Sequence, residues 1–153
     1  MSVTRLRRHV NAPRARVYRA LLDAHAIATW RVPPGMTSQV HVFEAREGGA
    51  IRVSLTYDAP GPAGKTTAHT DTYQGRFVKL VPDAQVVESI AFETDDPTMR
   101  GEMTLTLTLR DAPTGGTELL AVHEGLPSGV RPEDNAEGWR LSLERLAALV
   151  EAG

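Results

Sequence analysis

Polar side chains with the capacity for acid–base chemistry recur in segments that alternate like β-strands. His69, Asp71 and Tyr73 follow one another at two-residue spacing, and alternate residues of a strand project from one face of a sheet. The Asp71 carboxylate can then contact the His69 imidazole and fix its tautomer. Such a patch suits a ligand oxygen, or general acid–base catalysis of a cyclisation or hydration. The alternative is a solvated outer face, or a pair at the rim of the sheet.

Two further polar residues share a strand face with apolar neighbours. Glu88 lies in a run of alternating apolar residues that ends at Phe92, and Phe92 is itself a candidate ligand contact. If this face points inward, Glu88 is a carboxylate in apolar surroundings, which often marks a functional site. If it points outward, Glu88 is an ordinary surface acid. His123 follows Leu119 and Ala121 on one face, so we expect it to point inward as a hydrogen-bonded structural histidine or as a ligand contact.

Four less polar residues complete the candidate ligand contacts. Tyr57 ends an alternating strand segment, which would place its hydroxyl at the mouth of a cavity. Met103 begins the most regular alternating segment and offers an adaptable apolar side chain. Trp139 and Leu143 lie on the apolar stripe of the last predicted helix, where they either line a cavity or fill it.

Composition removes several classes of function. The chain has no cysteine, which excludes disulfides, thiol catalysis and thiolate metal sites. Its five histidines show no metal-ligand spacing, so we expect neither a metal nor a cofactor. The 17 basic and 19 acidic residues give a net charge of −2, which offers no electrostatic basis for binding nucleic acid.

The sequence also predicts a location. No apolar run approaches the roughly 20 residues of a membrane span, and the N-terminus lacks the apolar core of a signal peptide. We therefore expect a cytoplasmic protein. The basic residues are nearly all arginine, which indicates a bacterial genome rich in GC.

The elements that position these residues follow from the periodicity of apolar residues. Alternation predicts seven strands, and spacing typical of helices predicts a long last helix and two short ones after the first strand. The strands are expected at 3–10, 38–45, 51–57, 67–81, 85–94, 103–109 and 117–124, and the helices at 11–22, 24–30 and 131–151. Short turns between consecutive strands imply an antiparallel sheet, and the absence of a linker predicts one domain over residues 1–153.

The long helix needs a partner surface. Its apolar side chains form one stripe along the helix, opposite a charged face. A helix of this kind must bury its stripe against another element, and the predicted sheet is the available one. A seven-stranded antiparallel sheet with one dominant helix is expected to curl around that helix, while the two short helices close the gap between the first and second strands.

Short stretches along nearly the whole chain carry a resemblance to a known family. They are Asn11-Ala-Pro-Arg-Ala-Arg-Val-Tyr, Ile27-Ala-Thr-Trp30, Arg46-Glu-Gly-Gly49, Gly75-Arg-Phe-Val-Lys-Leu-Val-Pro82, Gly116-Thr117, His123-Glu-Gly125 and Gly138-Trp139. In this order and spacing the chain resembles the START/birch-pollen-allergen/polyketide-cyclase (SRPBCC) superfamily of helix-grip proteins. Within it, the chain looks like the bacterial proteins related to the C-terminal domain of activators of heat-shock-protein ATPase.

The resemblance implies an α+β helix-grip fold with a hydrophobic cavity between the curved sheet and the long helix. Relatives in this superfamily include lipid and hormone binders, cyclases and domains that resemble co-chaperones, so the fold alone does not select one activity. Three functions stay open: binding of a small hydrophobic lipid, polyketide or aromatic molecule, a cyclase or dehydratase using His69, Asp71, Glu88 or His123, and a module that contacts a chaperone. A homodimer is also open.

Overall fold

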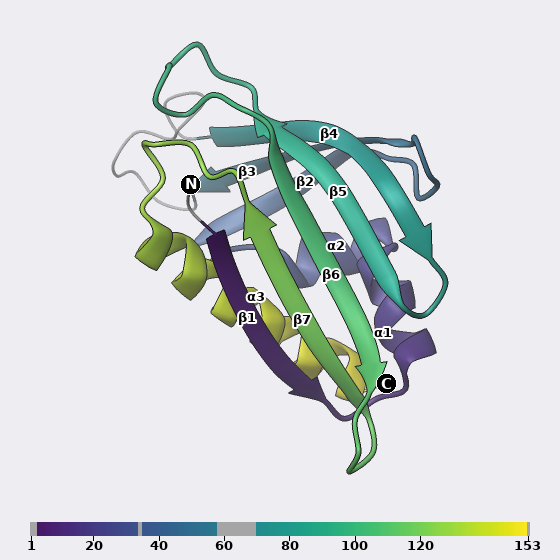
Figure 1. Cartoon of the computed structure of the whole chain (residues 1–153). Coiled ribbons are helices and arrows are strands. Elements are labelled where there is room, and N and C mark those ends of the chain that lie inside the picture. Colours follow the sequence, from purple (N-terminus) through teal and green to yellow (C-terminus); the bar gives the residue numbers. More distant parts are fainter. Residues whose placement is uncertain (1–2, 34, 58–69, 153) are drawn as a thin grey trace.

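One curved antiparallel sheet holds all seven strands, in the order β1-β7-β6-β5-β4-β3-β2 (Figure 1). The computed structural model describes residues 3–33, 35–57 and 70–152. Its elements are β1 (Val3–Val10), α1 (Arg14–Leu21), α2 (Ala24–Trp30), β2 (Met36–Phe43), β3 (Ala50–Tyr57), β4 (Thr70–Val81), β5 (Gln85–Phe92), β6 (Met103–Asp111), β7 (Thr117–Glu124) and α3 (Pro132–Ala152).

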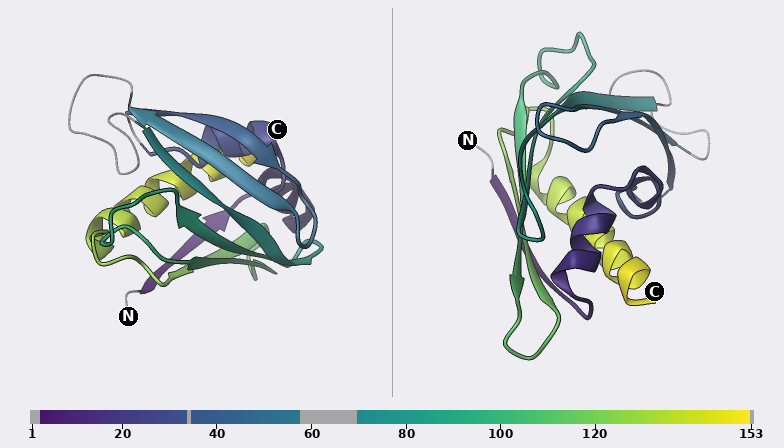
Figure 2. Two further views of the ribbon diagram at one scale, coloured as in Figure 1. Left: turned by 90° about the horizontal axis from the view of Figure 1, so that it is seen from above. Right: turned by 90° about the vertical axis from the view of Figure 1, so that its right-hand side faces the viewer.

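The fold expected from the sequence is confirmed. The sheet bends round α3, and the short helices α1 and α2 lie beside α3 on the concave side (Figure 2). Each strand pairs antiparallel with its neighbours, and the first strand joins the sheet through β7. The predicted ends differ by a few residues. For example, helix α1 begins at Arg14, because Pro13 keeps an extended backbone with ψ of 153°.

Alternation along the strands decides which side chains enter the core. In β6, Met103, Leu105, Leu107 and Leu109 are buried, and the threonines between them are only partly buried. These leucines belong to the same core cluster as the apolar stripe of α3. In its C-terminal half, Leu143, Leu146, Ala147 and Val150 are buried in the same cluster. Removing this apolar surface from water stabilises the pairing of sheet and helix by roughly 25 cal/mol for each Å² buried.

The short helix α2 is fixed at both ends. Asp23 caps its N-terminus by accepting hydrogen bonds from the backbone N–H groups of His25 and Ala26, at 2.8 and 3.1 Å. At its C-terminus the Trp30 side chain is fully buried, and its indole N–H donates to the carbonyl of Ala20, 3.1 Å away. These contacts set the position of the residue that follows, Arg31. No helix among the described residues is both long and apolar enough to cross a bilayer.

Gly75 in β4 has a different role from the one its sequence position suggests. A glycine inside a strand often marks a bulge, but Gly75 pairs regularly with Ile51 and Ile90, and the irregularity of the β4–β5 pairing lies between Phe77 and Lys79. A Cβ atom on Gly75 would lie 1.8 Å from the carbonyl oxygen of Ser89. Glycine is therefore required because the backbones of β4 and β5 approach closely.

We expect Gly75→Ala to lower the free energy of unfolding by at least about 1–3 kcal/mol, because the added methyl group overlaps the backbone of β5. Gly138→Ala, inside α3, is the matched control. No heavy atom lies within 4 Å of its added Cβ, so this variant should gain roughly 0.5–1 kcal/mol from the higher helix propensity of alanine. Urea unfolding of both variants measures the effects, and a Gly75→Ala protein as stable as wild type would contradict the close approach.

Candidate ligand-binding site

The charged pair Arg31–Glu88 lies inside the molecule. Arg31 Nη1 donates to both carboxylate oxygens of Glu88, at 2.9 and 3.0 Å, and these residues are only 7% and 1% exposed. Taking two such charges out of water costs several kcal/mol per ion, so each charge needs the other. Of the two alternatives for Glu88, the inward position is therefore the correct one. The surroundings of Glu88 are not purely apolar, however, because Arg31 lies beside it.

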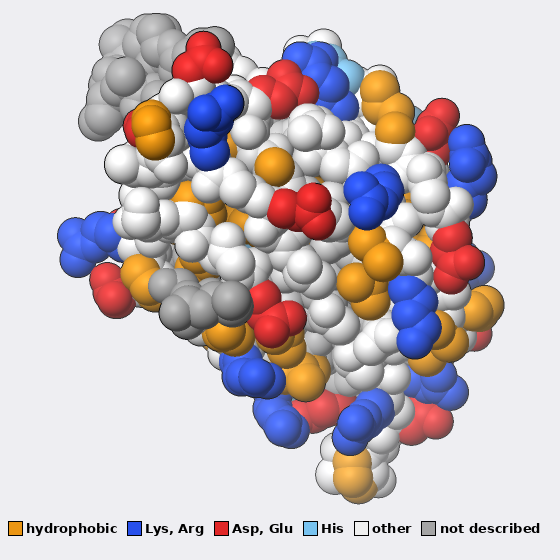
Figure 3. Space-filling model, turned by 45° about the horizontal axis from the view of Figure 1, so that its top comes forward, with side chains coloured by type: hydrophobic (Ala, Val, Ile, Leu, Met, Phe, Trp, Pro, Cys, Tyr) orange, Lys and Arg blue, Asp and Glu red, His pale blue; other side chains and the backbone are white. Residues whose placement is uncertain are grey.

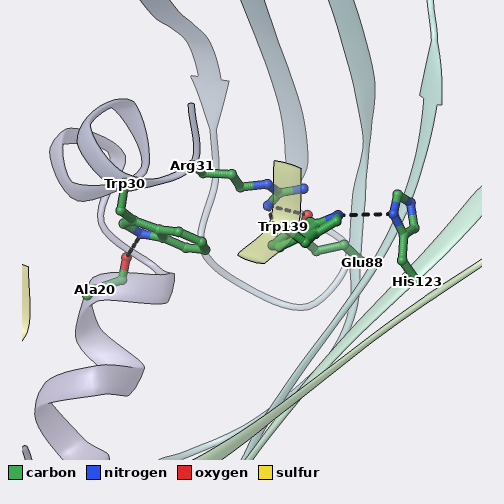
Figure 4. Close-up of polar contacts among 6 residues, drawn as sticks. All are labelled: Ala20, Trp30, Arg31, Glu88, His123 and Trp139. Carbon is green, nitrogen blue, oxygen red and sulfur yellow. Dashed lines mark hydrogen bonds and ion pairs between the residues drawn. The ribbon is translucent and has the colours of Figure 1, made fainter. Parts of the chain in front are cut away.

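Two aromatic rings flank the guanidinium of Arg31, and Figure 4 shows one of them, Trp139. Its Cζ lies 5.3 Å from the ring centroid of Tyr73 on β4 and 5.4 Å from that of Trp139 on α3. Both distances are within the range of a cation–π interaction, which gains strength away from water. Burial disfavours the charge, but the Glu88 carboxylate outweighs it and raises the pKa of Arg31. Arg31 therefore stays charged and joins α2, β4, β5 and α3.

His123 on β7 continues the polar network on the other side of Trp139. The Trp139 indole N–H donates to His123 Nδ1, 3.2 Å away (Figure 4). The Asn135 side-chain nitrogen is at the same distance from Nδ1. An indole nitrogen can only donate, so Nδ1 is an acceptor and the neutral ring carries its proton on Nε2. Burial, and secondarily the charge of Arg31, lowers the pKa of His123 to about 4. The ring is consequently neutral at pH 7.

A cavity of about 460 Å³ lies between the sheet and the N-terminal half of α3. Most of its wall is apolar, from Met36, Leu55, Ile90, Phe92, Met103 and Trp139. The polar groups are few and come from separate elements, and they include Arg31, Asp71, Tyr73, His123, Asn135 and Ser142. This combination of an apolar wall with a few convergent polar groups is typical of sites for small molecules.

Most residues predicted as ligand contacts lie around this cavity. Six of them line it: Tyr57, Tyr73, Phe92, Met103, His123 and Trp139. Glu88 lies behind the wall and reaches the cavity through Arg31. Leu143 is 2% exposed and belongs to the core cluster. His69 lies outside the described residues.

The face of β4 that carries Asp71 and Tyr73 points inward. Asp71 is 2% exposed and Tyr73 is 6% exposed, so a solvated outer face, the alternative for these two residues, is wrong. The residues of β3 that pair with Asp71 and Tyr73 are Leu55 and Val53, and they face the same side of the sheet. Asp71 and Tyr73 therefore share a wall of the cavity.

The sequence reasoning missed Arg31. Its contact with Glu88 spans 57 positions of the chain, and nothing in the local pattern around Arg31 distinguishes it from a surface arginine. One signal was available. A carboxylate on an apolar strand face requires a buried cation, and a search for arginines near apolar segments would have included Arg31, between Trp30 and Val32.

Breaking the buried pair from one side should be costly. We expect Arg31→Met or Glu88→Leu alone to lower the free energy of unfolding by about 3–5 kcal/mol, because each leaves an uncompensated buried charge. The double variant should lose much less than the sum of the two. Urea unfolding of the four proteins gives the coupling energy.

Arg52 and Glu93 form the matched control for this cycle. Their pair is also doubly hydrogen-bonded, at 2.8 and 3.0 Å, but it lies on the surface. Solvent screening makes such pairs weak, so the corresponding cycle should show much smaller coupling. Equal coupling energies in the two cycles would show that burial does not set the value of the Arg31–Glu88 pair.

The lowered pKa of His123 predicts a dependence of stability on pH. Between pH 6.5 and 4 the unfolded chain binds a proton at this residue and the folded one does not, so protonation favours unfolding as the pH falls. The contribution of His123 is complete above pH 6.5, and on the order of 2–3 kcal/mol is lost on approaching pH 4. We expect the urea midpoint to fall more steeply over this range for wild type than for His123→Gln. Parallel curves for the two proteins would contradict the neutral, buried imidazole.

Comparison with known proteins places this geometry in a family. A model of the family described as Activator of Hsp90 ATPase homolog 1-like protein matches residues 11–151. A protein from Chromobacterium violaceum, known from its crystal structure, shares 37% sequence identity with this chain. The two structures align with a TM-score of 0.87 over 98% of this chain and 97% of that one. None of the curated proteins matches the chain.

More distant structures share the fold. A protein of Rhodobacter sphaeroides is 24% identical, with a TM-score of 0.80 over 99% of this chain and 93% of that one. The AHSA1 protein of Silicibacter pomeroyi is 19% identical, with a TM-score of 0.79 over 99% of each chain. With the helix-grip architecture, the family match over residues 11–151 and the 37% identical relative, this chain belongs to the Activator of Hsp90 ATPase homolog 1-like family of the SRPBCC superfamily.

Proposed function

We propose that the protein binds a small hydrophobic molecule, such as a lipid, a polyketide or an aromatic compound, in the cavity between the sheet and α3. The observation that carries this proposal is the cavity itself. Its volume of about 460 Å³ falls in the range of roughly 300–1,000 Å³ that is common for ligand pockets. Its wall is mainly apolar, which favours a ligand with a large apolar surface.

The polar groups around the cavity support binding without catalysis. Glu88 is held by Arg31 through both carboxylate oxygens, which removes it as a general base. His123 accepts the Trp139 N–H at Nδ1, so its ring has no free acceptor nitrogen to abstract a proton. The cyclase or dehydratase alternative would have to rely on Asp71 and on His69, and the latter lies outside the described residues.

A chaperone contact is the third function, suggested by the family description. Docking on another protein usually needs a contiguous exposed apolar patch. Among the described residues the exposed large hydrophobic ones, Val3, Val42, Val78 and Leu149, lie on four different elements. Figure 3 shows acidic and basic side chains interspersed with small groups of hydrophobic ones over one face. These observations favour ligand binding over docking on a chaperone or on a second copy of the chain.

A ligand library and native mass spectrometry test the proposal. We expect hydrophobic molecules of two to four rings, or acyl chains, to raise the melting temperature and to add mass to the purified protein. Gly138→Phe should abolish both effects, since position 138 lines the cavity and has open space at its Cβ. Gly138→Ala, with the same backbone and a smaller side chain, should bind like wild type. A library without a thermal shift, together with protein that carries no bound mass, would refute the proposal.

A further inference from the structure

Arg31 has hydrogen-bond donors that the protein itself does not use. A guanidinium carries five N–H groups, and both contacts with Glu88 come from one nitrogen, Nη1 (Figure 4). Among the described residues, Nε and Nη2 of Arg31 have no hydrogen-bond partner. Unused donors on a buried cation need an explanation. A ligand that supplies the acceptor would explain them.

These two nitrogens are accessible from the cavity. The buried polar atoms of described side chains that lack a partner and are shielded from water do not include any nitrogen of Arg31. Nε and Nη2 therefore keep accessible surface. The Arg31 side chain is 8% exposed and lines the cavity, and the two rings beside it, of Tyr73 and Trp139, line the same cavity. The accessible edge of the guanidinium consequently opens onto the cavity.

The unused donors form a fork on one edge of the guanidinium. Nε–H and one N–H of Nη2 point in parallel from this planar group, so they converge on one acceptor group without help from another residue. Glu88 holds the guanidinium through Nη1, and the rings of Tyr73 and Trp139 lie beside it. These contacts restrict its rotation. Binding an oxygen at the fork therefore costs little rotamer freedom.

The charges near the fork decide between a neutral acceptor and an anion. Glu88 already balances the charge of Arg31. Asp71 is a second acid of the cavity wall and is 2% exposed, whereas Arg131, the other arginine of the described wall, has a side chain that is 74% exposed. A ligand carboxylate would thus join two buried acids that share one buried arginine, which is costly. A carbonyl oxygen accepts the same strong hydrogen bonds from a charged donor and adds no charge.

We infer that Arg31 is the polar anchor of the cavity, and that its Nε–H and Nη2–H groups donate to the carbonyl oxygen of a neutral acyl group in the ligand, as in a lactone, an ester or an amide. This inference rests on the proposed binding function and adds to it a contact residue and a chemical class. Glu88 is then a positioning residue, which holds the fork in place through Nη1.

Three tricyclic probes test the inference on the full chain by equilibrium dialysis at pH 7: phenanthrene, the lactone 3,4-benzocoumarin, which has the same shape, and phenanthrene-9-carboxylate. The double variant Arg31→Met/Glu88→Leu removes the fork together with its counter-charge, so no unpaired ion is left. We expect the affinity of the lactone relative to phenanthrene to fall about tenfold or more in this variant, as for the loss of one hydrogen bond to a charged group. This ratio cancels the difference in hydrophobicity between the two probes.

The double variant Arg52→Met/Glu93→Leu, which removes the ion pair on the surface, is the matched control and should keep the wild-type ratio. An unchanged ratio without Arg31 and Glu88 would overturn Arg31 as the anchor and leave the binding function intact. Wild type should bind the carboxylate less tightly than the lactone, and the reverse order would overturn the neutral class. No binding of any probe to wild type would overturn the inference and the binding function together.

A spectroscopic readout on the wild-type protein does not depend on the folding of the double variant. The Nε–H signal of Arg31 in a ¹H–¹⁵N correlation spectrum is identified by its absence from Arg31→Lys. With bound 3,4-benzocoumarin this proton should lie further downfield and exchange more slowly with water than with bound phenanthrene, because the carbonyl oxygen accepts it. The Nε–H of Arg52, which donates to Glu93 at 2.8 Å, should be the same in both complexes. An Arg31 signal that is also the same in both would overturn the inference.

Discussion

The buried ion pair between Arg31 and Glu88 constrains more of this structure than any other single contact. It joins the end of α2 to the middle of β5, and the rings of Tyr73 and Trp139 enclose the cation from β4 and α3. A pair of charges in such surroundings is stable only when its geometry is maintained, because either ion alone would be left without water or partner. The short helix α2, the strands β4 and β5 and the N-terminal half of α3 must therefore adopt positions that are consistent with this pair.

The same constraint divides α3 into two parts with different roles. From Leu143 to Val150 the buried face belongs to the core cluster, close to β1, α1 and α2. Towards the N-terminus Asn135, Gly138, Trp139 and Ser142 line the cavity. Trp139 lies at the boundary: one face is towards Arg31, its N–H is bonded to His123, and it is 9% exposed. It thus lines the cavity without filling it, because the cation and the imidazole fix its ring at the wall.

Local sequence patterns predicted the strands and the long helix. They could not predict the contacts between residues that are far apart in the chain. Alternation in 103–109 and the apolar stripe of 131–151 are properties of short segments, so both elements were predictable from the residues themselves. The inward position of Glu88 was one of two alternatives, because a strand pattern does not say which face is covered. Arg31 was missed since its role depends on a partner 57 positions away, and the tight spacing at Gly75 depends on the backbone of a neighbouring strand. The pattern gave the elements, while the contacts between them define the site.

The buried pair Arg31–Glu88 is an inefficient way to stabilise a core. Its position beside the cavity supports the proposed binding of a ligand. Replacing a buried ion pair by packed apolar side chains is often neutral or stabilising, and an unpartnered hydroxyl or imidazole nitrogen reduces stability further. Here the ion pair adjoins the cavity through Arg31, whereas β6 and the C-terminal half of α3 pack with ordinary apolar side chains. Among the described residues, two of the four buried polar atoms without a partner belong to Tyr73 and His123 of the cavity wall, and the other two belong to Arg8 and Ser38. The cost of the buried ion pair beside the cavity is expected if the protein distinguishes ligands by their polar groups. In the proposed function the cavity therefore combines an apolar wall, which would supply affinity, with fixed polar residues, which would supply selectivity.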